Sequence, residues 1–133
     1  MSDVIARLIG VYDADGSMVG ELSYLLRARI GRAHCALCDI THGRLRERAD
    51  WRACRERLPV PVVMFHRDDQ PEGVRNAVGA LAPVLVAETV AGALVVLADR
   101  EQLELCESSP ERLRGHIESA VLAHGLSWPT GAN

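Results

Sequence analysis

The sequence predicts a single α/β domain over residues 1–133, with a central mixed sheet of about four strands flanked by helices. Apolar, β-branched segments alternate along the chain with segments of helical periodicity. The first two apolar strands are separated by helical segments, so they should lie parallel. The last two are separated only by a short turn and should form an antiparallel hairpin. A chain of 133 residues can bury a core of its own.

The first half of the chain is expected to hold one strand and two helices. Val4 to Tyr12 is apolar and β-branched and ends at an acidic turn, which is typical of a strand. Apolar residues from Leu22 to Ile30 recur at helical spacing. His34 to Gly43 is expected to be an irregular loop. Leu45 to Leu58 is expected to be a surface helix, whose start could fall later with Asp50 as its cap.

The second half is expected to complete the sheet and cover it. Strands are expected at Val60 to His66, Pro83 to Glu88 and Ala93 to Ala98, and helices at Pro71 to Leu81 and, in two parts, from Arg100 to His124. Asp99 is placed to cap the first part of the final helical segment. The residues from Ser127 to the end, about 127–133, are expected to form a loose tail.

This order of elements resembles the thioredoxin-like superfamily, which includes the glutaredoxins. Those folds run strand, helix, strand, helix, strand, strand, helix, and they place a cis-proline just before the third strand, where Pro83 stands here. The resemblance covers most of the chain and implies a thioredoxin-like domain with an inserted loop and helix, about 32–58, after the first helix. The redox cysteines of the family lie between the first strand and the first helix, here Gly16 to Val19. The Cys-x-x-Cys of this chain comes later.

The densest chemical segment runs from His34 to His42 and contains a Cys-x-x-Cys pair. Two cysteines separated by two residues can direct both sulfurs at one point, as in half of a tetrahedral zinc site. A histidine four residues after the pair and another at the end of a strand could complete the coordination. The candidate ligands are Cys35, Cys38, His42 and His66, with His34 and Cys54 as alternates. We therefore expect a transition-metal site, with zinc as the first candidate.

Two other functions use the same region. Cys35 and Cys38 could instead be the catalytic pair of a thiol–disulfide oxidoreductase, since such a pair can close a disulfide. The chain could also be a non-catalytic adaptor, in which the surface from Arg44 to Arg57 meets another protein. The expected partner is thus a metal ion or a thiol/disulfide partner protein. Cys54 and Cys106 lie among apolar neighbours and are expected to be buried.

Composition and missing motifs exclude other classes. The net charge of −3 gives no reason to expect nucleic acid, and all 15 basic residues are Arg, so no Lys is present for Schiff-base chemistry. No apolar segment is long enough for a membrane helix, and no leader is evident at the N-terminus, so a cytoplasmic location is expected. No phosphate-binding or dinucleotide-binding glycine motif is present, so no nucleotide cofactor is expected.

Overall fold

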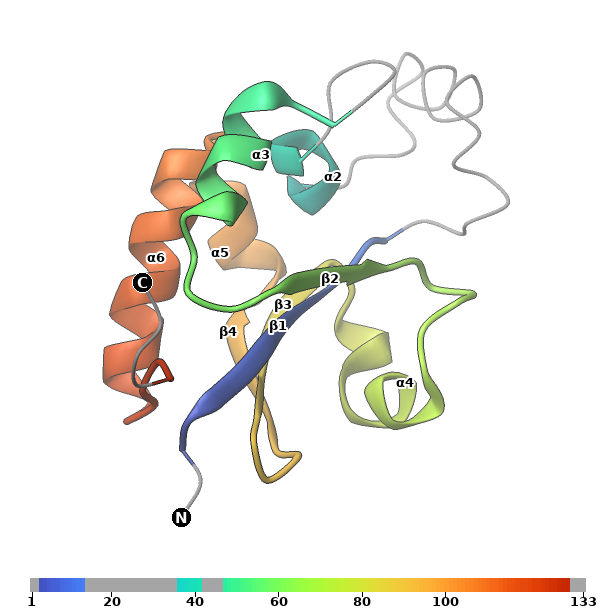
Figure 1. Ribbon diagram of the computed structural model, residues 1–133. Helices are drawn as coiled ribbons and strands as arrows, with labels where there is room; N and C mark the ends of the chain where they lie inside the picture. The colour runs from blue at the N-terminus through green and yellow to red at the C-terminus, as the bar shows by residue number, and fades with distance from the viewer. Residues whose placement is uncertain (1–2, 14–35, 42–46, 130–133) are drawn as a thin grey trace.

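The computed structural model describes residues 3–13, 36–41 and 47–129 (Figure 1). Its strands are β1 (Ile5–Val11), β2 (Val62–Phe65), β3 (Val84–Thr89) and β4 (Leu94–Ala98). Its helices are α2 (Ala36–Thr41), α3 (Ala49–Glu56), α4 (Glu72–Val78), α5 (Arg100–Leu105) and α6 (Pro110–Ala123), with a 3-10 turn, η2 (Gly79–Leu81), after α4. The helix predicted from Leu22 to Ile30 lies outside the described residues.

The strands form one mixed sheet in the order β2-β1-β3-β4 (Figure 1). β2 runs parallel to β1, with Leu8 paired to Val62, and β3 runs antiparallel to β1, with Ile9 paired to Val86. β4 returns antiparallel to β3 as a hairpin. The α/β class, the four strands, the parallel first pair and the antiparallel hairpin are therefore confirmed. The Ala82–Pro83 peptide bond before β3 is cis, as predicted.

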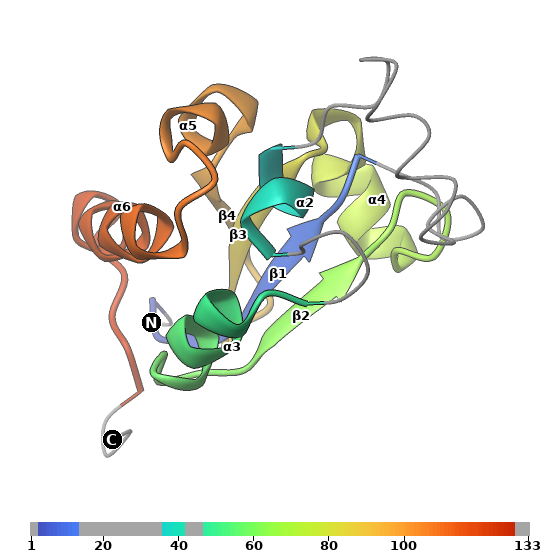
Figure 2. The same cartoon turned by 90° about the horizontal axis from the view of Figure 1, so that it is seen from above.

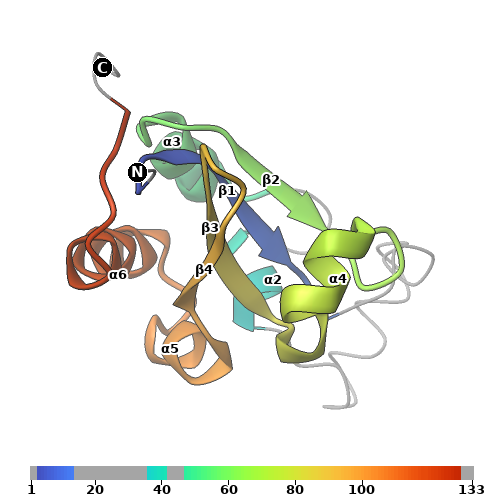
Figure 3. The ribbon, with the colours of Figure 1, turned by 90° about the horizontal axis from the view of Figure 1, so that it is seen from below.

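Helices cover both faces of the sheet. α4 lies on one face, and α2, α3, α5 and α6 lie on the other (Figures 2 and 3). Successive side chains of β1 point to opposite faces of the sheet, as in any β-strand. Leu8 is fully buried in the larger core cluster with the four helices, and Ile9 is fully buried in the smaller cluster under α4.

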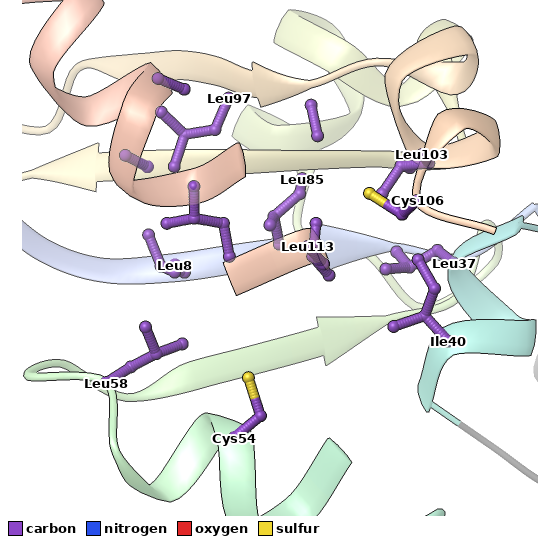
Figure 4. Close-up of a cluster of buried hydrophobic side chains, with 14 of the residues drawn as sticks. Leu8, Leu37, Ile40, Cys54, Leu58, Leu85, Leu97, Leu103, Cys106 and Leu113 are labelled. Carbon is purple, nitrogen blue, oxygen red and sulfur yellow. The ribbon is translucent and has the colours of Figure 1, made fainter. Parts of the chain in front are cut away.

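The segment predicted as an irregular loop, His34 to Gly43, contains a helix, α2, from Ala36 to Thr41. Leu37 and Ile40 stand three residues apart, so they share one face of this helix, and both are fully buried. Figure 4 shows both side chains extending from α2 into the core. A helix of six residues is not stable alone, so tertiary packing maintains it. That packing is a long-range effect, which explains why local periodicity missed it.

The next helix, α3, covers Ala49–Glu56, shorter than the predicted range from Leu45 to Leu58. It starts late, as one alternative expected, but Arg48 is its N-cap and Asp50 lies inside its first turn. The Asp50 carboxylate accepts hydrogen bonds from the Trp51 backbone and from the Arg48 side chain. The predicted Asp50 cap is therefore wrong by two positions. The carboxylate still lies at the favourable, positive end of the helix dipole.

The predicted starts of the last two helices, α5 and α6, are confirmed. The Asp99 side chain accepts a hydrogen bond from Gln102 N, and the Gln102 side chain accepts one from Asp99 N, which forms a complete capping box. The Ser109 side chain caps α6, which begins at Pro110. Within the part of the chain that the structure describes, no helix combines the length and apolarity needed to cross a membrane.

The chain after α6 is attached to the sheet. Ser127 N donates to Asp3 O, and Ile5 N donates to Ser127 O, each at 2.9 Å. The Trp128 side chain packs against the larger core cluster. Ser127 and Trp128 therefore do not belong to the loose tail that was predicted from residue 127. Backbone hydrogen bonds hold this segment, and they leave no pattern in the side-chain sequence.

Candidate functional site

Three parts of the chain meet where β1 and β2 end. Tyr12 is the residue after β1, and His66 is the residue after β2. Their rings lie 5.4 Å apart, centre to centre, with a tilt of 39°. Val11 is paired with Val84, which follows the cis-Pro83, so the start of β3 lies at the same edge. In sheets with parallel strands, this carboxyl edge is where ligands commonly bind.

Helix α2 is attached to this edge by a buried hydrogen bond. The Tyr12 hydroxyl and Thr41 Oγ1 lie 2.9 Å apart, and Thr41 Oγ1 donates to the Cys38 carbonyl oxygen at 3.4 Å. Burial raises the pKa of Tyr12 to about 12, with Glu47 adding to the rise and the Thr41 hydrogen bond opposing it. The phenol therefore stays protonated near neutral pH.

A glycine in β1 leaves room for the close approach of α2 to the strand. A Cβ added at Gly10 would lie 2.5 Å from Met64 Cε and 3.3 Å from Leu37 Cδ2. Both distances are shorter than ordinary van der Waals contact. Gly10 thus makes room for the α2 side chain Leu37 and for Met64 of β2 on the same face of the sheet.

Cys38 is the third residue of α2, and it is disulfide-bonded and 7% exposed. Its carbonyl receives the Thr41 hydrogen bond, so the Tyr12 contact ends on the Cys38 peptide group. The other sequence-predicted members of the Cys/His cluster lie outside the described residues. They are His34, Cys35 and His42.

His66, the predicted fourth metal ligand, is held by the turn that follows β2. Its Nδ1 lies 2.9 Å from Asp69 Oδ2, and its backbone N donates to Asp69 Oδ1 at 2.5 Å. A carboxylate at Nδ1 fixes the orientation of an imidazole ring, a common arrangement around histidine ligands and bases. Asp69 thus gives His66 a defined orientation beside Tyr12 at the edge that also anchors α2.

The two remaining cysteines are free and buried, as expected from their apolar neighbours. Cys54, the alternate metal ligand, donates its thiol to Pro110 O at 3.5 Å, between α3 and α6. Cys106 donates to Gln102 O at 3.4 Å. Burial raises the pKa of both thiols. Raised pKa values reduce thiolate content, so neither cysteine has the environment of a reactive thiol.

A group of charged side chains from three parts of the chain adjoins the same edge. Asp13 Oδ1 lies 3.2 Å from Arg67, and Asp13 Oδ2 lies 3.3 Å from Arg100. Arg100 also donates to Ala82 O at 2.6 Å, next to the cis peptide bond. Asp13 therefore links the end of β1 to the segments that follow β2 and β4. The three residues come from separate parts of the sequence, so no local motif could have predicted their contacts with one another.

The proposed adaptor surface on α3 carries paired charges. Glu47 accepts hydrogen bonds from Arg52 at 3.2 Å and from Arg55 at 2.8 Å, and Arg57 pairs with Glu111 of α6 at 2.6 Å. The Arg55 hydrogen bond lowers the pKa of Glu47. These arginines are engaged within the chain itself.

Among residues 3–13, 36–41 and 47–129, no three His, Cys, Asp or Glu side chains are grouped so as to hold a metal ion. Cys35 and His42 lie outside these ranges. Comparison of the chain with protein-family models, with curated proteins and with solved structures gives no match. The function therefore has to be argued from the residues alone.

Proposed function

We propose that this chain is a thioredoxin-like thiol–disulfide exchange protein in which Cys35 and Cys38 form the redox pair. The observation that carries the proposal is the state of the cysteines. The chain has four, of which Cys54 and Cys106 are free thiols and Cys38 is disulfide-bonded. We assign Cys35 as the partner of Cys38 within this proposal, because a separation of two residues suits a small redox loop.

The fold supports the thioredoxin-like assignment. The sheet order β2-β1-β3-β4, with a parallel first pair and a terminal hairpin, agrees with what that resemblance implies. The cis-Pro83 agrees as well. The Cys-x-x-Cys is displaced along the sequence, but α2 brings Cys38 back to the carboxyl edge of β1 through Thr41 and Tyr12. The displaced pair would thus act at the edge of the sheet where the superfamily's own pair follows the first strand.

In the proposed reaction, a thiolate of a partner protein or of a small monothiol attacks Cys35 Sγ, because Cys38 is only 7% exposed. The Cys35–Cys38 bond breaks, a mixed disulfide forms on Cys35, and the Cys38 sulfur leaves as a thiolate and takes up a proton. A second thiolate attacks the partner sulfur of the mixed disulfide, and Cys35 leaves and is protonated. Two partner thiols thus lose two electrons and two protons, which the cysteine pair gains.

Zinc binding by Cys35, Cys38, His42 and His66 is the competing proposal for the same residues. A thiol ligates zinc as a thiolate, so a sulfur that is bonded to another sulfur is not available as that ligand. The disulfide at Cys38 therefore favours exchange over a permanent zinc site. The expected cytoplasmic location would supply reduced glutathione for the exchange.

The test is equilibration of the purified chain in mixtures of reduced and oxidised glutathione, with the dithiol fraction measured by alkylation and mass spectrometry. Metal content is measured on protein purified without chelator. We expect a reversible two-electron couple that is lost in Cys35→Ser and in Cys38→Ser. The matched control is Cys106→Ala, another buried cysteine, which should leave the couple unchanged. One tightly bound zinc per chain with both thiols protected would overturn the proposal, and so would the absence of a reversible couple.

A further inference from the structure

We propose that Tyr12 is a positioning residue that sets the reduction potential of the Cys38 disulfide by holding α2 through Thr41. The inference rests on the proposed function, and it adds to it a control on the redox poise of the same site. Tyr12 is outside the Cys/His cluster and is 29 residues from Thr41 in sequence. Its hydroxyl reaches α2 only because the fold brings the end of β1 against that helix.

The direction of the hydrogen bonds follows from the number of protons available. A threonine hydroxyl has one proton, and Thr41 donates it to the Cys38 carbonyl, which can only accept. Either hydroxyl can donate in the contact between Tyr12 and Thr41, and we assign the phenol as the donor on this ground. A phenol whose pKa is about 12 supplies that proton at every pH at which the cysteine pair would work. The arrangement is therefore a directed series from Tyr12 through Thr41 to the peptide group of Cys38.

The surroundings make the series rigid at its Tyr12 end. Tyr12 is 5% exposed, and its ring meets the ring of His66, whose Nδ1 lies 2.9 Å from Asp69 Oδ2. Thr41 is fully buried. A hydrogen bond between buried groups is costly to break, because water does not readily reach them to replace it.

The connection to redox poise is a linkage between two constraints on α2. The disulfide constrains Cys38, the third residue of α2, and the Tyr12–Thr41 hydrogen bond holds the last residue of the same helix. When each constraint makes the other easier to form, the coupling between them is reciprocal. The factor by which the disulfide favours the hydrogen bond is then the factor by which loss of the hydrogen bond disfavours the disulfide. The reduced chain, without its covalent constraint, holds α2 less firmly and gains less from the hydrogen bond.

The experiment measures the equilibrium constant between the chain and glutathione for wild type, Tyr12→Phe and Thr41→Val. Both variants keep the shape of the side chain and remove a hydroxyl. We expect each to make the disulfide easier to reduce, by about fivefold in the equilibrium constant, since the net contribution of one hydrogen bond is of that order. For a two-electron couple this corresponds to a potential about 20 mV less negative.

Two controls separate positioning from general stability. Thr41→Ser keeps the hydroxyl and should restore the wild-type potential. Val78→Ala on α4, in the smaller core cluster on the opposite face of the sheet from α2, should lower stability without changing the potential. As a second readout, Tyr12→Phe should lower the free energy of unfolding more in the oxidised chain than in the reduced chain. The difference between the two losses should correspond to the fold-change in the equilibrium constant with glutathione.

The outcomes are distinct. A wild-type couple with the expected shift in both variants and rescue by Thr41→Ser supports the inference. A wild-type couple with equal potentials in all variants overturns it and leaves the proposed function standing. Absence of a couple in the wild type overturns the proposed function and this inference together. If Tyr12→Phe fails to fold, Thr41→Val with Thr41→Ser decides the question.

Discussion

The docking of α2 can be tested at Ile40, which is fully buried in the larger core cluster. Ile40→Ala removes three carbon groups, and at ~0.8 kcal/mol for each buried group the transfer cost is about 2.4 kcal/mol. The cavity left behind adds to this, so the total should lie within about 2–5 kcal/mol. Ile40→Val should cost only about 0.5–1.5 kcal/mol. Urea unfolding of the oxidised chain measures both values.

A second readout localises the effect. In the reduced chain, Cys38 is expected to react slowly with an alkylating reagent, because the structure leaves it 7% exposed. Its reaction requires α2 to open, and Ile40→Ala weakens the attachment of that helix directly. A loss of 1.4 kcal/mol from the docking of α2 would raise its open population about tenfold. We therefore expect Cys38 to react at least about tenfold faster in Ile40→Ala.

The control is Ile117→Ala on α6, an equally buried isoleucine in the same cluster. It should lower the free energy of unfolding by a similar amount, about 2–5 kcal/mol, without the local increase at Cys38. The alkylation is followed by peptide mass spectrometry, which distinguishes Cys38 from the free buried thiols Cys54 and Cys106. An Ile40→Ala chain with unchanged stability and an unchanged Cys38 rate would refute the described packing of α2.

Three further outcomes are expected. Asp99→Ala should lower the free energy of unfolding by ~1 kcal/mol, measured by urea unfolding, because it removes the capping box with Gln102; an unchanged midpoint would contradict that cap. The hydrogen bond from Arg55 lowers the pKa of Glu47 in the folded chain. This pair therefore stabilises the fold at pH values above the pKa of Glu47 in the unfolded chain, about 4.3. The stabilisation is lost as the pH falls through the pKa of Glu47 in the folded chain. Glu47→Gln should flatten that part of the stability–pH curve, and identical curves would exclude the pair as a source of acid sensitivity. Ser108 has a φ of 61°, a left-handed conformation that glycine adopts easily and valine does not. Ser108→Gly should therefore raise the midpoint of thermal unfolding, and Ser108→Val should lower it. The reverse order would count against a left-handed backbone at this residue.

The sequence was informative wherever a signal was local. The hairpin of β3 and β4 follows from two short apolar runs around a turn, and the start of α5 follows from Asp99. Helix α2 was missed because Leu37 and Ile40 are the two large apolar side chains that its described residues bury. Two such residues do not make a recognisable period, and packing against the sheet supplies the rest. Tertiary context decided this element.

The candidate site was predictable only in its parts. Cys38 and His66 were selected as candidates from residue type and spacing, whereas Thr41 was not among the candidate ligands. Tyr12 ends the segment that was predicted as the first strand, and it is buried. Its hydrogen bond to Thr41 depends on how α2 crosses the end of β1. Contacts between residues so far apart in sequence depend on topology, and a single sequence does not contain that information in local form.

The place of β1 in the sheet has a consequence for synthesis of the chain. β1 is synthesised well before its neighbours in the sheet, since Leu8 pairs with Val62 and Ile9 pairs with Val86. Such distant pairings slow folding, because a long loop must close before the contacts that stabilise it can form. A nascent chain that has not yet reached β3 leaves one side of an apolar strand without a partner. We therefore expect this interval of translation to be the period in which the protein most needs protection from aggregation.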